Sequence, residues 1–441
     1  MKPEIELVPH RAAICSDQPT TIQLLVRIKP PLLDSLPRPE MALSIALDRS
    51  GSMSGAPLSQ AKKAAQMLVD ELEGKDRMAL VAFDHYVDVV LDLTRQTSPK
   101  EMKTRIDCIT EGGNTDLHSG WLAGCRQLTL PSVDGKSKRV IILSDGAANT
   151  GICCPQTICR QVEDWRRQGI STSAVGLGLH YNEVLLSSIA AAGGGNFSHA
   201  ESAEEVEPFF AAEFQGLALT YGEQVELSLE LAQGVKAVRV YNKLANRPDG
   251  SLGLTDLVLG YSKEILFEFS LPALQNGNNL CRFHLRYKDK QTGSAHRVSQ
   301  VLTLAVATHA ALVEFPVDAE VLAKRNIQLA ARALDLAREH ISLREIEKAR
   351  EVMQQALLTL KESPSTPEVQ RQEAQIREMI SLLDQQQYQS VAKRATATSS
   401  SLSYSSITLA GTPLTVWCKL PPEERTKERL EEMLRDWNPA G

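Results

Sequence analysis

The chain lacks several features that would place it in a specialised class of protein. Its 441 residues contain no apolar run that approaches the roughly 20 residues needed to span a bilayer. The N-terminal segment MKPEIELVPHRAAICSDQ has no basic stretch followed by an apolar core, so it does not resemble a secretory signal. We therefore expect a cytoplasmic protein without a membrane span.

An excess of positive charge is also missing. The chain has 48 Lys and Arg residues against 54 Asp and Glu residues, which gives a formal net charge of -6. Binding to nucleic acid requires a basic face, so we expect no nucleic-acid partner. Apolar residues make up 43% of the chain and charged residues 23%, as in an ordinary soluble protein. A chain of this length predicts about two to four domains.

Cysteine is sparse, with eight residues spread from Cys15 to Cys418. In a long cytoplasmic chain such residues are expected to be reduced thiols, most of them buried. The segment GICCPQTICR gathers three of them, Cys153, Cys154 and Cys159. Adjacent cysteines suit a tetrahedral zinc site poorly and no His lies nearby, which favours loop packing. A metal or redox role for these three remains the alternative.

Residues 41–220 alternate apolar strands with amphipathic helices. The run Met41–Leu47 is continuously apolar, as in a strand buried on both faces. Further strands are expected at Arg77–Phe83, Val87–Leu91, Arg139–Leu143 and Ser171–Gly176, with helices between most of them. This alternation predicts an α/β fold: a doubly wound, mostly parallel, Rossmann-like sheet with helices on both faces.

Five oxygen-bearing side chains occupy the expected carboxyl edge of this sheet. Asp48, Ser50 and Ser52 end the first strand in IALDRSGSM, and Asp145 ends a later strand in VIILSDG. Thr115, in GGNTDL, immediately precedes a helix. Sheets of this kind bind ligands outside the carboxyl ends of their strands. Two carboxylates and three hydroxyls are the donors that a hard cation such as Mg²⁺ prefers.

The segments on either side of the α/β region have a different sequence pattern. Strand-like alternation occurs at 4–8 and 20–28 and again in several runs between 224 and 305. The two N-terminal strands are too few to fold alone. We expect them to join the later strands, so that the α/β domain is inserted in an antiparallel β-sandwich.

From Asp318 the pattern becomes helical and predicts a small bundle. The segment RATATSSSLSYSSIT is rich in Ser and Thr, which is typical of a flexible linker. A last amphipathic helix, in EERTKERLEEMLRDW, could dock on this chain or on a partner. The expected domains are sandwich strands at 1–38, the α/β domain at 40–220, the sandwich remainder at 222–310, a helical hairpin or bundle at 316–390, a linker at 391–412 and a helical tail at 413–441.

Other polar residues near these strand ends allow alternatives. The five oxygen donors could serve only as helix caps and turn formers. Asp84, His85 and Asp88 could hold a second metal, although a solvated hairpin is favoured. His118 follows the Thr115 loop closely and is more typical of a packing or surface residue than of a ligand.

The order of these motifs resembles the von Willebrand factor type A (VWA) domain family. The run Asp48-Arg49-Ser50-Gly51-Ser52, followed by Thr115 and by Asp145-Gly146, looks like a complete metal-ion-dependent adhesion site. The resemblance covers about residues 40–220. The wider layout, with flanking strands and a helical tail, is similar to bacterial proteins of this type and to inter-alpha-trypsin inhibitor heavy chains.

The resemblance implies roles for individual residues. Ser50 and Ser52 would bind Mg²⁺, or Mn²⁺, through their hydroxyls, and Thr115 would bind directly or through water. Asp48 and Asp145 would hold coordinated waters or bind directly. One position on the ion would stay open for an Asp or Glu side chain of a partner protein. Residues expected to rim the site are Arg49, Met53 and Asp116.

We consider three functions for this site. The first is a non-enzymatic, metal-dependent module that captures an acidic side chain of a protein partner. The second is an adaptor or regulatory subunit that works beside an AAA+ ATPase of the MoxR type, or in a signalling or conflict system. The third is a metal-dependent hydrolase, which is disfavoured because the sequence offers no convincing general base beside the site.

Overall fold

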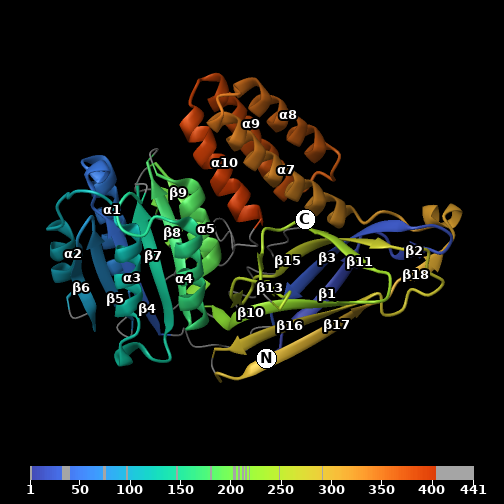
Figure 1. Cartoon of the computed structure of the whole chain (residues 1–441), viewed down its shortest axis with the longest axis horizontal. Helices are drawn as coiled ribbons and strands as arrows, with labels where there is room; N and C mark the ends of the chain where they lie inside the picture. Colours follow the sequence, from blue (N-terminus) through green and yellow to red (C-terminus); the bar gives the residue numbers. More distant parts are fainter. Residues whose placement is uncertain are drawn as a thin grey trace, which may run out of the picture. The chain divides into compact units, whose positions relative to one another are not determined.

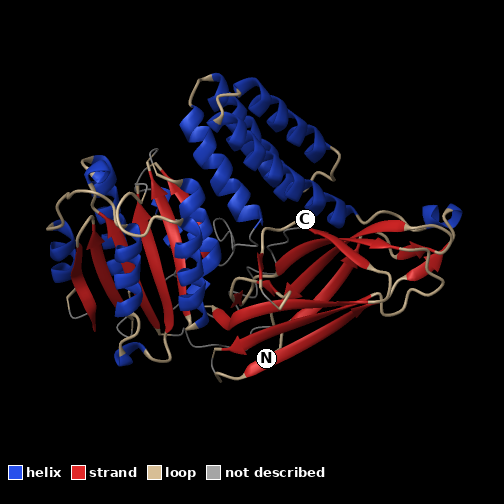
Figure 2. Ribbon diagram, viewed as in Figure 1, coloured by secondary structure: helices blue, strands red, loops and turns tan. Residues whose placement is uncertain are grey.

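The computed structural model describes residues 2–31, 40–72, 76–95, 98–145, 148–178, 181–201, 205–206, 209–210, 213, 216–217, 219–247, 249–290 and 292–403. The chain divides into two compact units. The described residues before 35 and from 220 to 403 form one unit, and those between 35 and 219 form the other. Figures 1 and 2 show the helices and strands of each.

The second unit is a doubly wound α/β domain. Its six-stranded sheet has the order β6-β5-β4-β7-β8-β9, and β6 is antiparallel to β5 while the other neighbours are parallel. Its strands are β4 (Met41–Asp48), β5 (Arg77–Phe83), β6 (Val87–Arg95), β7 (Ser137–Ser144), β8 (Ile170–Leu177) and β9 (Gly194–Ala200). Its helices are η1 (Gly51–Met53), α1 (Ala56–Glu71), α2 (Pro99–Asp107), α3 (Leu117–Gln127), η2 (Pro131–Val133), α4 (Pro155–Arg167) and α5 (Glu183–Gly193).

Strand β4 lies at the centre of this domain. All eight of its residues are buried, as the continuous apolar run predicts. Leu43 and Ile45 belong to the core that includes α1, whereas Ala42 and Ala46 belong to the core that includes α3, α4 and α5. Successive side chains of the strand therefore enter two separate hydrophobic cores, one on each face of the sheet.

The first unit contains an antiparallel sandwich whose strands come from both ends of the α/β insertion. One sheet has the order β1-β3-β15-β11 and the other β12-β13-β10-β16-β17, with β14 also pairing β10 and a separate β18-β2 pair. The strands are β1 (Glu4–Pro9), β2 (Ala13–Cys15), β3 (Thr20–Lys29), β10 (Thr220–Leu231), β11 (Lys236–Val240), β12 (Ala245–Asn246), β13 (Leu252–Gly253), β14 (Leu257–Val258), β15 (Lys263–Leu271), β16 (Cys281–Asp289), β17 (Ala295–Leu302) and β18 (Ala305–Ala307), before the short helix η3 (Ala310–Glu314).

Pairing of β3 with β15 confirms the predicted insertion. Nine residue pairs, from Lys263↔Ile28 to Leu271↔Thr20, join the two strands across more than 230 positions of sequence. The rings of Phe267 on β15 and Phe283 on β16 meet edge to face at 5.1 Å between their centroids, which joins the two sheets in one core. The predicted fold class, an α/β domain inserted in a sandwich and followed by a helical bundle, is therefore confirmed.

Four helices complete this unit: α7 (Ala319–Ser342), α8 (Ile346–Lys361), α9 (Pro367–Asp384) and α10 (Tyr388–Ser403). The fourth corrects the prediction of a flexible linker at 391–412, because residues 388–403 are helical. Val391 and Ala395 are fully buried in the bundle core, so tertiary packing outweighs the Ser/Thr-rich composition. The rest of the predicted linker and the 413–441 tail lie outside the described residues.

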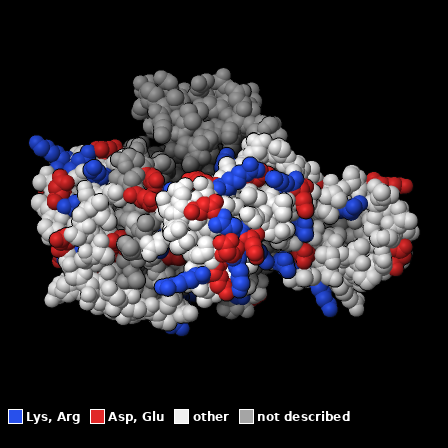
Figure 3. All heavy atoms as spheres, turned by 90° about the horizontal axis from the view of Figure 1, so that it is seen from above, with Lys and Arg blue, Asp and Glu red and all other residues white. Residues whose placement is uncertain are grey.

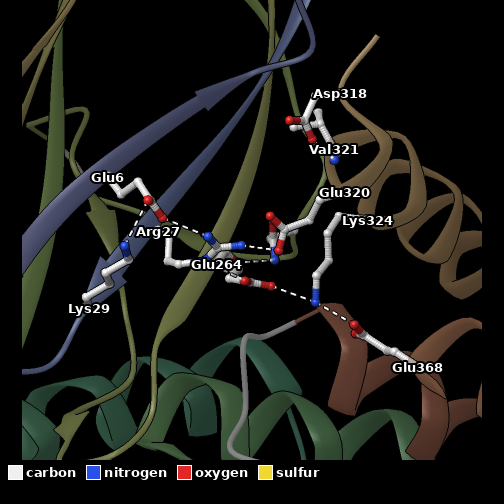
Figure 4. A network of polar contacts seen from close by, with 10 residues as sticks. Glu6, Arg27, Lys29, Glu264, Asp318, Glu320, Val321, Lys324 and Glu368 are labelled. Carbon is white, nitrogen blue, oxygen red and sulfur yellow. Dashed lines mark hydrogen bonds and ion pairs between the residues drawn. The ribbon is translucent and has the colours of Figure 1, made fainter. Parts of the chain in front are cut away.

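An ionic network joins the sandwich to the bundle within this unit (Figure 4). Arg27 on β3 donates to Glu6 at 2.7 Å and to Glu264 at 2.9 Å, and it also pairs with Glu320 on α7. Lys324 on α7 contacts Glu264 at 2.8 Å and Glu368 on α9 at 2.5 Å. We call this network the ionic junction; its members are Glu6, Arg27, Glu264, Glu320, Lys324 and Glu368.

Two surface features bear on possible partners. None of the described helices is long and apolar enough to cross a membrane. On the face drawn in Figure 3, Lys and Arg side chains are interspersed with Asp and Glu side chains. This face therefore differs from the uniformly basic surface that attracts nucleic acid.

Candidate metal centre

Asp48 is the last residue of β4 and is completely buried. The Ser144 hydroxyl, at the end of the neighbouring strand β7, donates to its Oδ2 at 2.5 Å. The Ser50 backbone N–H donates to its Oδ1 at 2.8 Å. Both carboxylate oxygens are therefore held in place by groups from adjacent loops and strands, as expected for a preorganised site.

A chain of oxygen atoms leads from Asp48 toward the surface. The hydroxyls of Ser50 and Ser52 lie 3.1 Å apart, and the Ser52 hydroxyl donates to Oδ1 of Asp145 at 2.9 Å. Ser50 and Asp145 are buried, whereas Ser52 is exposed. The sequence predicts these residues as one group, and the fold brings them within hydrogen-bond reach of one another.

Thr115 lies on an adjacent loop that is tied to the Ser50 loop through the backbone. The Gly51 N–H donates to Gly113 O at 2.8 Å, and the Gly112 N–H donates to Arg49 O at 2.7 Å. Thr115 itself is buried, and its N–H donates to the side-chain oxygen of Asn149 at 2.8 Å. The fifth predicted residue thus shares the same edge of the sheet with the other four.

Asp84 organises this edge and was not predicted to do so. It is buried, and its carboxylate accepts the backbone N–H groups of Tyr86 at 2.6 Å and Gly113 at 3.1 Å. A Cβ on Gly112 would lie 1.7 Å from Oδ2 of Asp84, so only glycine fits there. The expectation of a solvated hairpin is wrong for Asp84, because its carboxylate is a fixed support of the Thr115 loop.

Arg49 is the basic residue closest in sequence to the donor set, and its charge is already neutralised. Its guanidinium lies 2.5 Å from Asp88 and 3.6 Å from Asp84. Its backbone N–H donates to Phe83 O at 2.8 Å. The Arg49 side chain therefore forms ion pairs with Asp84 and Asp88, two of the three residues considered above for a second metal site.

The predicted rim requires one correction. Met53 is fully buried in the core beneath the site, because η1 turns its side chain toward α1 and β4. Asp116 is partly exposed, and its carboxylate accepts the N–H and the hydroxyl of Ser119 at 2.9 Å each, as the N-cap of α3. Of the three predicted rim residues, Met53 has no access to a partner.

The other polar candidates have structural partners. His118 is buried, its Nε2 lies 2.8 Å from Oε1 of Gln161, and its ring packs near Trp121. No group of three or more His, Cys, Asp or Glu residues suited to a metal occurs in the described part of the chain. Asp84, His85 and Asp88 therefore form no such group, and the donor set described above differs from it in that three of its five members are hydroxyls.

The electrostatics of the two buried carboxylates differ. Burial raises the pKa of Asp48, hydrogen bonds from Ser144 and Ser50 oppose the rise, and the charge of Asp84 adds to it. Burial also raises the pKa of Asp84, but the N–H groups of Tyr86 and Gly113 and the charge of Arg49 outweigh it, so that pKa is lowered. A positive charge placed beside Asp48 would therefore relieve an unfavourable environment.

Fold and site together define a doubly wound α/β domain with an oxygen-only donor set at the carboxyl edge of its sheet. The family model of the von Willebrand factor type A (VWA) domain matches residues 43–212, so this part of the chain is a VWA domain. This confirms the resemblance inferred from the sequence.

Known proteins are similar to this chain over different lengths. The uncharacterized protein YfbK of Escherichia coli (strain K12) is 26% identical over 327 residues, covering 70% of this chain and 55% of YfbK. Inter-alpha-trypsin inhibitor heavy chain H3 of Mesocricetus auratus is 32% identical over 124 residues, 26% of this chain and 14% of that protein. A solved von Willebrand factor type A structure from Catenulispora acidiphila has a TM-score of 0.67 at 17% identity, covering 86% of this chain and 89% of that one.

These similarities cover different shares of the chain. The match to heavy chain H3 is confined to about a quarter of this chain. The solved structure has the same fold across both units, since it covers 86% of the chain. The chain spans little more than half the length of YfbK.

Proposed function

We propose that the α/β domain binds a divalent cation, Mg²⁺ or alternatively Mn²⁺, and uses it to capture an Asp or Glu side chain of a partner protein. VWA domains commonly mediate metal-dependent protein interactions, and this chain carries such a domain. Asp48, Ser50, Ser52, Thr115 and Asp145 would hold the ion. The bound cation would supply the positive charge that an incoming carboxylate requires.

The single observation that supports this best is the continuous set of oxygen donors from Asp48 to Asp145. Ser50 and Ser52 link hydroxyl to hydroxyl at 3.1 Å, and Ser52 reaches Asp145 at 2.9 Å. Oxygen donors without His or Cys suit a hard cation. Hydroxyl ligands carry no charge, so they leave more of the ion's charge available to a partner than carboxylate ligands would.

Two further features agree with capture of an acid. Ser52 is exposed, whereas its neighbours in the set, Ser50 and Asp145, are buried, so a partner can reach the set at Ser52. Arg49, the basic residue within the motif, contacts Asp88 and Asp84, so its charge is shared with those carboxylates. An incoming acid would then depend on the metal for its principal charge interaction.

Peptide binding tests this function directly. Peptides with a central Asp or Glu, each matched by a peptide with Asn or Gln, are immobilised and exposed to the full chain with Mg²⁺. We expect binding only to the acidic members, loss of binding with EDTA, and loss in Ser52→Ala. Ser54→Ala is the matched control, because Ser54 is exposed on the same loop and lies outside the donor set. Equal binding of acidic and amide peptides would contradict the proposal.

A further inference from the structure

The loop at 149–154 packs directly on the Thr115 segment. The Asn149 side-chain oxygen accepts the Thr115 N–H at 2.8 Å, and the N–H groups of Asn149 and Thr150 donate to Thr115 O at 3.1 and 3.2 Å. Gly151 has φ +71°, and a Cβ there would lie 2.4 Å from Oδ2 of Asp116. Both backbone polar groups of Thr115 are therefore bonded to this loop, and any displacement of the loop must disturb them.

Two adjacent cysteines end this loop, and both are exposed. The Cys153 thiol donates to Thr150 O at 3.4 Å, which ties it to the same residue that holds Thr115. Cys154 is the N-cap residue of α4, and its thiol donates to Oε1 of Gln156 at 3.2 Å. The hydroxyl and N–H of Thr157 and the N–H of Gln156 lower the pKa of Cys154, which favours the thiolate.

Other cysteines in the described part of the chain have different surroundings. Burial raises the pKa of Cys125, that of Cys281 to about 12 and, together with the charge of Glu163, that of Cys159 to about 11. Cys108 is exposed at the C-terminal end of α2, far in sequence from the pair. It provides an exposed single thiol for comparison with the adjacent pair.

We propose that Cys153 and Cys154 form a thiol-modification site for small-molecule disulfides, and that modification there loosens the Thr115 loop and weakens the metal site. The site fits a disulfide because both cysteines are exposed to solvent and are adjacent in the chain. The effect on the metal rests on the proposed function, whereas the thiol reaction and the loosening of the loop do not.

The chemistry is thiol–disulfide exchange. The Cys154 thiol loses its proton to solvent, and its sulfur attacks one sulfur of a disulfide RS–SR. A Cys154–S–S–R bond forms, the RS–SR bond breaks, and RS⁻ leaves and takes up a proton. Cys153 can then attack the Cys154 sulfur and release the second RS⁻, so that the pair is oxidised by two electrons and one RS–SR is reduced to two RSH.

Either product changes the shape of the loop. A mixed disulfide on Cys154 adds a bulky group to the residue next to Cys153, whose thiol contacts Thr150 O and Gly151 O. Closure of the pair is strained, since adjacent Cα atoms are about 3.8 Å apart whereas disulfides usually span about 4.4–6.8 Å. Such strain makes the closed form easily reduced, so the modification is reversible by thiols.

The reaction of the full chain with 5,5′-dithiobis(2-nitrobenzoate) tests the thiol site. We expect a fast phase, at least about tenfold faster than the reaction of Cys108, because the thiolate is the attacking species. Cys154→Ser should abolish that phase, Cys153→Ser should reduce the thiolate released, and the control Cys108→Ser should retain it. A reaction of Cys154 no faster than that of Cys108 would overturn the inference.

Hydrogen exchange then tests the coupling to the loop without any metal. Modified protein should exchange the Thr115 amide at least about tenfold faster than untreated protein, and dithiothreitol should restore the protection. Cys154→Ser should show no change on treatment. Unchanged exchange at Thr115 after complete modification would overturn the coupling.

Mn²⁺ titration separates this inference from the proposed function. Weaker Mn²⁺ binding after modification, by at least about fivefold and reversed by dithiothreitol, supports both. Unchanged Mn²⁺ affinity in fully modified protein overturns the regulatory inference and leaves the proposed function intact. Absence of Mn²⁺ binding to untreated protein overturns the proposed function. The thiol reaction and the loosening of the Thr115 loop are then tested by the thiol and hydrogen-exchange measurements.

Discussion

The Asp48 carboxylate at the edge of the α/β sheet and the Glu264 carboxylate of the ionic junction are held by different kinds of partner. At the junction, Arg27 and Lys324 contact Glu264 from two sides. At the sheet edge, Asp48 is held by the Ser144 hydroxyl and the Ser50 N–H. The first arrangement balances negative charge with positive charge, whereas the second orients a carboxylate with neutral donors.

The direction of the pKa shifts follows from this difference. Burial raises the pKa of Glu264, but Lys324 and Arg27 outweigh it and the net pKa is lowered. Burial dominates at Asp48, and its pKa is raised. A group of charges that is already balanced acts as a structural junction, while a buried acid oriented by neutral groups is suited to receive a cation.

The largest effect is expected when the junction loses its shared carboxylate. Glu264→Ala leaves Arg27 and Lys324 without their common partner, which should lower the free energy of unfolding by about 2–4 kcal/mol. The side chain is a quarter exposed, so the loss should fall below that of a fully buried pair. Chemical denaturation of the metal-free chain measures it. A loss below about 0.5 kcal/mol would place the junction among ordinary surface ion pairs.

The pH dependence sharpens the same contrast. Because the pKa of Glu264 is lowered in the folded chain, its stabilisation is present above its unfolded pKa, near 4.3, and is lost as the pH falls through the folded pKa. Asp48 has a raised pKa, so its ionisation costs stability above the folded pKa and costs nothing below the unfolded pKa. We therefore expect Glu264→Gln and Asp48→Asn to change the pH dependence of the free energy of unfolding in opposite directions relative to wild type. Denaturation at several pH values between 7 and about 3 measures this.

A smaller effect is expected from the support of Asp48. Ser144→Ala removes the hydroxyl that fixes Oδ2 at 2.5 Å while leaving the proposed ligands in place. Mg²⁺ affinity should fall by about tenfold, because groups that orient ligands typically contribute that much. Calorimetric titration provides the value. An unchanged affinity would show that Ser144 is a packing residue alone.

The smallest effect concerns metal-free stability at the sheet edge. Asp48→Asn removes a buried charge whose pKa is raised, so the metal-free chain should gain about 1 kcal/mol at pH 7 and unfold a few degrees higher. Stabilisation by added Mg²⁺ should disappear in this variant. Loss of stability instead would mean that the Asp48 hydrogen bonds outweigh the cost of its burial.

Sequence patterns predict the α/β domain well because its signals are local. The continuous apolar run that becomes β4 is visible in the sequence. The spacing of the donor residues after the strands likewise predicts that they meet at one edge.

Long-range contacts were beyond the reach of the same patterns. Asp84, Ser144 and Asn149 support the predicted donors through side chains that converge only in the folded sheet. Their spacing in sequence has no period, and Asp84 resembles a residue of an exposed turn. Helix α10 was missed because its Ser and Thr content resembles a linker, and only the burial of Val391 and Ala395 reveals its role.

Titration calorimetry of the full chain with Mg²⁺ tests the central claim most directly. Wild type and the control Ser54→Ala should bind one Mg²⁺ ion with the same affinity, and Ser52→Ala should bind at least about tenfold more weakly. Indistinguishable titrations of wild type and Ser52→Ala, or no heat from either, would contradict the claim that this set of oxygen atoms holds a cation.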